Sequence, residues 1–247
     1  MKAYKSMLIN EMKLSLRGMD MVIFAVCLPL VVLTIIGIIY GDKPAFEGAT
    51  YTFLDQSFGG ICTIAICAGG VMGLPLVISD YREKQILKRF KVTPVKPIVI
   101  LLVQVTIYAI YSATSLITLF IVAKLFFGLN IKGRILEFII GWIFVMISMF
   151  SIGMMVGGIA KNTKLAGVIA SVLYFPMLIF SGATLPYEVM PSAMQKVVSI
   201  LPLTQSIKFL KSVVLGLPAS DMIIPIFFMI VIMGACIFVS IKFFRWE

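Results

Sequence analysis

The chain has 247 residues, of which 61% are hydrophobic and only 13% are charged, and its mean hydropathy is +1.10. Soluble domains carry about twice this share of charged residues and disordered chains lack this many apolar ones, so the composition excludes both classes. The net charge of +10 does not indicate nucleic-acid binding, because no soluble basic module with interleaved aromatic residues is present. A helical membrane protein with several spans fits both length and composition.

The residue inventory also excludes common kinds of active site. The chain has no His, so His general bases and imidazole metal ligands are excluded. Its four Cys lie inside apolar runs without CxxC spacing. The sequence contains no phosphate loop of the GxxxxGK[ST] type and no paired acids of a hydrolase. The sequence therefore predicts a chain that is not an enzyme and that holds no metal or cofactor of its own.

Six apolar stretches fit helices that cross the hydrocarbon core of a bilayer. Fourteen of the 21 basic residues fall on one side of these stretches, so the positive-inside rule places both termini in the cytoplasm. Glycine pairs at a spacing of four, Gly37/Gly41, Gly69/Gly73 and Gly153/Gly157, predict close helix packing. The predicted spans are residues 21–40, 57–79, 98–123, 135–160, 165–180 and 222–244.

Residues 1–20, before the first span, mix apolar residues at helical spacing with Lys5, Glu11, Lys13 and Arg17. This pattern predicts an amphipathic helix that lies at the cytoplasmic interface with its basic face toward the lipid headgroups. The alternative is a frayed tail that only fixes the topology.

The loop at residues 80–97 is longer than a connection between neighbouring spans requires. Ile86, Leu87 and Phe90 fall on one side of a helix that ends before Thr93-Pro94. A short helix with a small apolar knob suits docking into a groove of a partner protein. The alternative is a basic loop that only fixes the topology, and the residues alone do not decide between the two.

The segment 181–221 is heavily apolar, but four prolines cut it into pieces shorter than a span. It predicts re-entrant or interfacial helices on the outer face, one after Met190-Pro191 and one over residues 205–214. The alternative is a seventh, proline-kinked span, which would place the carboxyl terminus outside. The prolines are Pro186, Pro191, Pro202 and Pro218.

The third span carries a moderately polar stripe that is a candidate lining for a translocation path. The stripe consists of Gln104, Tyr108, Tyr111, Ser112, Thr114 and Ser115, of which Gln104, Tyr108, Tyr111 and Ser115 are the candidates for lining the path. No span has an ionisable Asp, Glu, Lys or Arg at its centre, which argues against ion-coupled transport through an intramembrane acid.

Two segments together resemble the signatures of ABC-2 type transporter permeases. In REKQILKRFKVTP, residues 82–94, Gln85 stands where the family commonly has Gly and Phe90 stands where Leu is usual. The residues of this segment that match are Glu83, Leu87, Lys88, Arg89, Thr93 and Pro94. The second segment resembles the family's carboxyl-proximal signature through Phe175-Pro176, Ser181-Gly182, Pro186, Glu188, Met190-Pro191 and 201–204.

The resemblance implies the membrane subunit of an ABC exporter. Such a subunit works as a dimer with an identical or paralogous permease and with two copies of a separate ATPase, which binds the ATP and Mg. The resemblance makes residues 82–92 the coupling helix, and the residues expected to contact the ATPase are Arg82, Glu83, Ile86, Leu87, Arg89, Phe90, Thr93 and Pro94. It makes the outer segment a gate over the path, with Ser181, Gly182, Pro186, Glu188, Pro191 and Pro202.

The expected function is ATP-driven export of an amphipathic substrate across a bacterial plasma membrane. A drug, as in multidrug resistance, a peptide antibiotic or a lipid would fit. Two alternatives remain open from the sequence. One is export of a polysaccharide or lipid-linked glycan, and the other is a membrane scaffold or sensor subunit that transports nothing.

Overall fold

The computed structural model describes residues 2–41, 43–46, 48–86, 97–182 and 191–243. Within these ranges the chain is helical, and the only sheet-type pairing is a single bridge between Pro44 and Thr52. Six helices are long and apolar enough to cross a membrane, which confirms the all-helical fold and the predicted number of spans. They are Asp20–Tyr40, Phe53–Glu83, Ile98–Phe127, Ile135–Ile159, Thr163–Phe180 and Ser220–Phe243.

The first two spans each contain a π-helical turn that ends two residues before a proline. A proline lacks the N–H of a regular helix and its ring crowds the carbonyl one turn back, and the wider π turn accommodates both effects. The prolines are Pro29 and Pro75. The first span consists of α2 (Asp20–Val22), η1 (Ile23–Cys27) and α3 (Leu28–Tyr40), and the second of α4 (Phe53–Cys67), η2 (Ala68–Gly73) and α5 (Leu74–Glu83).

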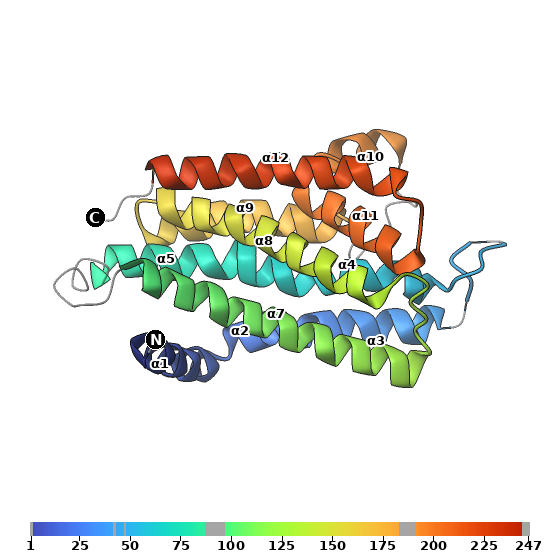
Figure 1. Cartoon of the computed structure of the whole chain (residues 1–247), viewed down its shortest axis with the longest axis horizontal. Coiled ribbons are helices and arrows are strands. Elements are labelled where there is room, and N and C mark those ends of the chain that lie inside the picture. The colour runs from blue at the N-terminus through green and yellow to red at the C-terminus, as the bar shows by residue number, and fades with distance from the viewer. Residues whose placement is uncertain (1, 42, 47, 87–96, 183–190, 244–247) are drawn as a thin grey trace.

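The second span forms the centre of the bundle (Figure 1). In its most apolar stretch 83% of the residues are buried, against 17–50% in the other five spans, whose outer faces carry exposed apolar side chains. The helices that follow it in the chain are α7 (Pro97–Phe127), α8 (Ile135–Ile159), α9 (Thr163–Phe180), α10 (Ser192–Val198), α11 (Pro202–Leu215) and α12 (Ser220–Phe243).

The bundle has two distinct ends (Figure 1). The helix α1 (Lys2–Gly18), the end of α5, the start of α7, the turn between α8 and α9 and the end of α12 lie together at what we call the termini end. The loop between α3 and α4, the loop between α7 and α8, and the helices α10 and α11 lie at the opposite, far end.

Glycines allow α8 to approach the second span closely. A Cβ atom at Gly153 would overlap the carbonyl oxygen of Gly70, and one at Gly157 would lie 2.9 Å from the Cβ of Ile78. The close packing predicted for Gly153/Gly157 is therefore confirmed. Gly41 is different, because it ends α3 with a φ of +41° and serves the turn rather than helix packing.

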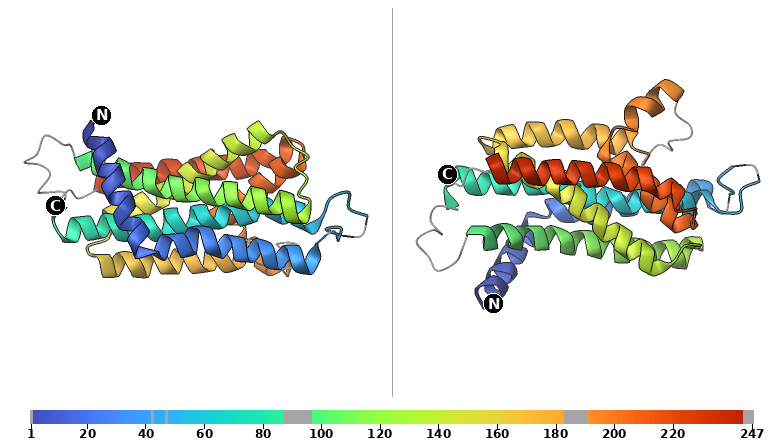
Figure 2. Two further views of the ribbon diagram at one scale, coloured as in Figure 1. Left: turned by 90° about the horizontal axis from the view of Figure 1, so that it is seen from below. Right: turned by 45° about the horizontal axis from the view of Figure 1, so that its top comes forward.

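The helix α1 runs across the bundle rather than along it (Figure 2). Tyr4, Met7, Leu8 and Met12 are half-buried and pack against the core, while Lys5 and the other basic side chains described for α1 are exposed. The segment is thus an amphipathic helix and not a frayed tail. Its apolar stripe faces the protein, and its place at the membrane surface stays a prediction.

At the far end, α11 is built into the core against α4, α8 and α12. Pro191 is the residue before α10 and Pro202 is the first residue of α11, positions that suit a residue with no N–H to donate. The helices have seven and fourteen residues, and a span needs about 20, so neither crosses a membrane by itself. Their re-entry into the bilayer stays a prediction.

Candidate functional site

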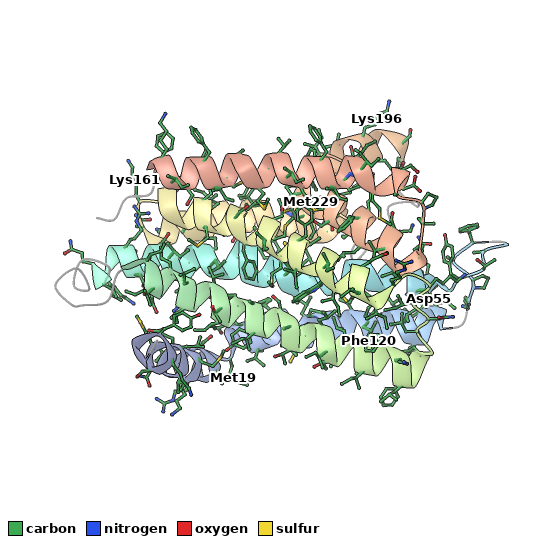
Figure 3. All side chains as sticks on the ribbon, in the orientation of Figure 1. Met19, Asp55, Phe120, Lys161, Lys196 and Met229 are labelled. Carbon is green, nitrogen blue, oxygen red and sulfur yellow. The ribbon has the colours of Figure 1, made fainter. Side chains whose placement is uncertain are left out.

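Three consecutive residues at the end of α5 send their side chains to three different parts of the chain. Tyr81 contacts α1 and α7, Arg82 contacts the end of α8, and Glu83 contacts the start of α9. They directly precede the loop predicted to couple to a partner. Lys161, in the turn between α8 and α9, marks this end of the molecule in Figure 3.

The Arg82 side chain caps the carboxyl end of α8. Its Nη1 donates to the carbonyl oxygens of Gly157, Gly158 and Ala160, at 2.9, 2.8 and 2.8 Å, and the residue is only 8% exposed. The last carbonyls of a helix have no partner within it and carry its negative dipole end, so a buried guanidinium is well matched to them. The close approach of α8 at Gly157 brings these carbonyls within reach.

The Glu83 side chain caps the amino end of α9. Its Oε2 accepts a hydrogen bond of 2.8 Å from the backbone N–H of Thr163, the first residue of that helix. A carboxylate at this position complements the positive end of the helix dipole. Asn162 caps the same helix by accepting from the N–H of Leu165. Arg82 and Glu83 therefore hold both sides of the short turn between α8 and α9.

The Tyr81 hydroxyl belongs to a polar cluster that joins three elements. It donates to Oε2 of Glu11 at 2.6 Å, and Nε2 of Gln104 donates both to the same oxygen at 3.0 Å and to the Tyr81 hydroxyl at 2.7 Å. Tyr111 donates to Ser15 at 3.0 Å further along α1. These bonds fix α1 to α5 and α7 near the start of the loop that is predicted to couple to a partner.

The helix α5 ends in a left-handed residue, Gln85, with a φ of +55°. Its N–H donates to the carbonyl of Arg82 at 2.9 Å, as in the usual end of a helix. Glycine adopts this conformation most readily. This gives a physical reason why the family that the chain resembles commonly has glycine at the position of Gln85.

Of the residues expected to contact an ATPase, three are described. Arg82 is buried in its contact with α8, Glu83 is exposed but bonded to α9, and Ile86 is half-buried. Leu87, Arg89, Phe90, Thr93 and Pro94 lie outside the described residues, so the docking helix stays a prediction.

The polar stripe predicted to line a path faces other parts of this chain. Gln104 and Tyr111 bond to the cluster with α1, and the Tyr108 ring lies against Gly69 and Gly73 of η2. Ser115 is fully buried. The structure thus brings Gln104 and Tyr111 into the contact with α1, and a role in lining a path stays a prediction.

Cavities at the far end involve part of the predicted gate. A cavity of about 250 Å³ contains Ser181 and Gly182 among its lining residues, with Gln56, Ser57, Ile207, Lys208, Lys211, Ser212, Leu217 and Asp221. A neighbouring cavity of about 530 Å³ lies between α10, α11 and α12. Pro191 directly precedes α10 and Pro202 begins α11, and the predicted gate residues Pro186 and Glu188 lie outside the described residues.

A third cavity, of about 290 Å³, opens between α7, α8 and α12. It is apolar except for two serines and is lined by Val105, Met146, Ile147, Phe150, Ser151, Met154, Ile237, Ser240 and Ile241. In the part of the chain that the structure describes, no three Cys, Asp or Glu side chains gather closely enough to hold a metal ion.

Sequence reasoning missed Asp55, which organises the far end and is labelled in Figure 3. Its Oδ2 accepts from the N–H of Thr52 in a capping box, and its Oδ1 accepts from the N–H of Asn130 at 2.9 Å. The Thr-x-x-Asp spacing before an apolar run is a signal for the cap. Tyr81 and Glu11 were also missed as a pair, because no local pattern connects residues 70 positions apart.

Six apolar helices, five of them around the buried second span, without a soluble domain among the described residues, define a multi-pass membrane protein. The chain belongs to the ABC-2 type transporter family, whose model matches residues 2–215. Permeases of this family work with ATPase subunits in ABC transporters. The resemblance found in the sequence is therefore confirmed.

Two relatives extend this comparison. The chain is 22% identical over 187 residues to the inner membrane transport permease YhhJ of Escherichia coli (strain K12) and, to the same extent, to that of Shigella flexneri. The matched region covers 73% of this chain and 49% of each relative. The chain thus spans about half the length of the curated relatives it matches.

Proposed function

We propose that this chain is the permease subunit of an ATP-driven exporter, with its termini end in the cytoplasm. The observation that carries the proposal is the junction at Tyr81, Arg82 and Glu83, which anchors the base of the predicted coupling loop to α1, α7, α8 and α9. A loop that receives force from a partner needs such an anchor, whereas a loop that only fixes topology does not.

The placement of basic residues supports the orientation. The described parts of the segments assigned to the inner side by their Lys and Arg content, which are α1, the end of α5, the turn between α8 and α9 and the end of α12, lie at the termini end in Figure 1. ATP and Mg would be bound by a separate ATPase subunit, present in two copies. A second permease, identical or paralogous, would complete the complex.

The cavities support an amphipathic substrate, such as a drug, a peptide antibiotic or a lipid. The cavity between α7, α8 and α12 offers almost only apolar side chains. The two cavities at the far end are lined largely by hydroxyl, amide, Lys and Asp side chains. A molecule with an apolar body and a polar head would meet a matching surface at each stage of export.

The test is ATP-dependent transport into inside-out membrane vesicles that contain the chain and its ATPase. Three probes represent the substrate classes: an amphipathic cationic dye, a membrane-active peptide and a fluorescent phospholipid. We expect ATP to drive uptake of at least one probe. Uptake of none, in vesicles that support other ATP-driven exporters, would contradict the proposal and favour a scaffold or sensor.

A variant in the loop tests the coupling role. Burying a Phe side chain in a partner groove contributes roughly 1.5–3 kcal/mol, so Phe90→Ala should weaken the ATPase complex roughly 10- to 150-fold. The matched control is Phe126→Ala at the far end, where the side chain is 75% exposed. We expect lost uptake in the first variant and wild-type uptake in the second. Equal uptake in both would contradict the docking role of Phe90.

A further inference from the structure

The loop that receives force is covalently continuous with α5 and α7 only. The helices α8 and α9 follow later in the chain, and their connection at residues 160–162 is short. Arg82 and Glu83 nevertheless bond to both sides of this connection from the last turn of α5. Two side chains thus provide a second, noncovalent route from the base of the loop into the bundle.

The route is tight enough to carry displacement. Arg82 is buried and its guanidinium is held by three backbone acceptors at 2.8–2.9 Å. Beneath it, a Cβ at Gly157 would stand 2.9 Å from Ile78, so α5 and α8 meet nearly backbone to backbone. Glu83 adds a charge-assisted bond of 2.8 Å to the first N–H of α9. If the end of α5 shifts, these hydrogen bonds are kept only when the α8–α9 turn moves with it.

We propose that Arg82 and Glu83 are positioning residues that transmit movement of the coupling loop to the α8–α9 turn. The inference rests on the proposed function and adds a specific mechanical connection to it. In this account, ATPase closure moves α8 and α9 together with α5. Loss of the connection lets ATP hydrolysis continue while α8 and α9 lag behind, so the ratio of probe exported to ATP hydrolysed decreases.

The bond between Glu83 and α9 can be removed from either side. Glu83→Ala deletes the acceptor, and Thr163→Pro deletes the donor, because proline has no N–H. Proline suits this position, since Thr163 is the first residue of α9 and the preceding Asn162 is extended, with φ −151° and ψ 168°. Ile135→Pro is the matched control, because it places proline at the first residue of α8, at the far end, again after an extended residue.

The experiment measures export of the responding probe and ATP hydrolysis for the intact complex in vesicles. We expect Glu83→Ala, Thr163→Pro and the double variant each to lower the export-to-hydrolysis ratio by roughly two- to fivefold, the factor that a solvent-exposed carboxylate at a helix amino end supplies. The double variant should be no worse than either single one, because all three lose the same bond. Ile135→Pro should keep the wild-type ratio.

Arg82 is tested by the pair Arg82→Met and Arg82→Lys. Both variants keep a long side chain, but only Lys retains a charge and donors, so we expect Lys to restore part of the ratio that Met loses. Should Arg82→Met fail to fold, Arg82→Lys tests the bond to α8, and Glu83→Ala and Thr163→Pro still test the bond to α9.

Two results separate the inference from the proposed function. A wild-type ratio in both Glu83→Ala and Thr163→Pro, with active export, would overturn the inference and leave the exporter in place. Equal loss of hydrolysis and export in every variant would also overturn it, since that outcome marks a purely structural cap. A wild-type complex that exports no probe would refute the proposed function itself.

Discussion

The substitution Gly153→Ala tests the packing on which the whole arrangement depends. Its new Cβ would overlap the carbonyl oxygen of Gly70 and would lie 2.9 Å from the carbonyl carbon of the same residue and 3.3 Å from the Cβ of Leu74. The overlapping group is backbone, so no side-chain rotation relieves the contact. The two helices must separate instead.

The magnitude follows from the usual cost of overpacking. One extra methyl group in a packed interior costs about 1–3 kcal/mol, and the rigid neighbour places this site near the upper value. For a chain of about 250 residues, each kcal/mol lowers the Tm by roughly 2–4 °C, so a loss of about 3 kcal/mol corresponds to roughly 6–12 °C.

The assay is thermal unfolding of the detergent-purified protein, followed by circular dichroism. Gly234→Ala in α12 is the matched control, because nothing lies within 4 Å of a Cβ at that position and alanine is the better helix former. We expect a lower Tm for Gly153→Ala and no decrease for the control. An unchanged Tm for Gly153→Ala would refute the close approach of α8 to the second span.

Three further substitutions test separate contacts. Asp55→Ala removes the cap of α4 and the bond to the N–H of Asn130, so we expect the free energy of unfolding to decrease by about 2 kcal/mol. A wild-type Tm in thermal unfolding would contradict the bridging role of Asp55. Tyr81→Phe removes the donor to Glu11, so trypsin should cleave faster at the basic residues of α1; an unchanged rate would show that the cluster does not hold α1. Gln85→Val should be less stable than Gln85→Gly by about 1–2 kcal/mol, since φ is +55° there; equal Tm values would exclude the left-handed conformation.

The elements of the fold were predictable from the sequence because their signals are local. Hydropathy accumulates over some twenty residues, so six spans emerge even though single residues carry little information. Pro191 indicated the start of α10 because proline lacks the N–H that a helix interior requires. The second helix was predicted over residues 205–214, whereas α11 begins three residues earlier, at Pro202. The prediction of close packing was wrong at Gly41. Its spacing from Gly37 suggested helix packing, but its backbone conformation serves a turn.

The junction at the end of α5 was not predictable in the same way. Arg82 was expected at a partner surface, and its actual acceptors lie 75–78 positions later in the chain. Glu11 and Gln104 meet although 93 positions separate them. The sequence alone is compatible with three roles for a charged residue next to a span: a topology signal, a docking residue or a helix cap. Only the contacts in the folded chain distinguish the three roles.

The central claim is that this chain works with a separate ATPase that docks at the loop after α5. The most direct measurement is affinity purification of the tagged chain from its native membranes in mild detergent, followed by mass spectrometry. We predict a roughly stoichiometric P-loop ATPase with the wild-type chain, lost with Phe90→Ala and retained with Phe126→Ala. Recovery of the wild-type chain without any ATPase, under conditions that preserve other membrane complexes, would contradict the account.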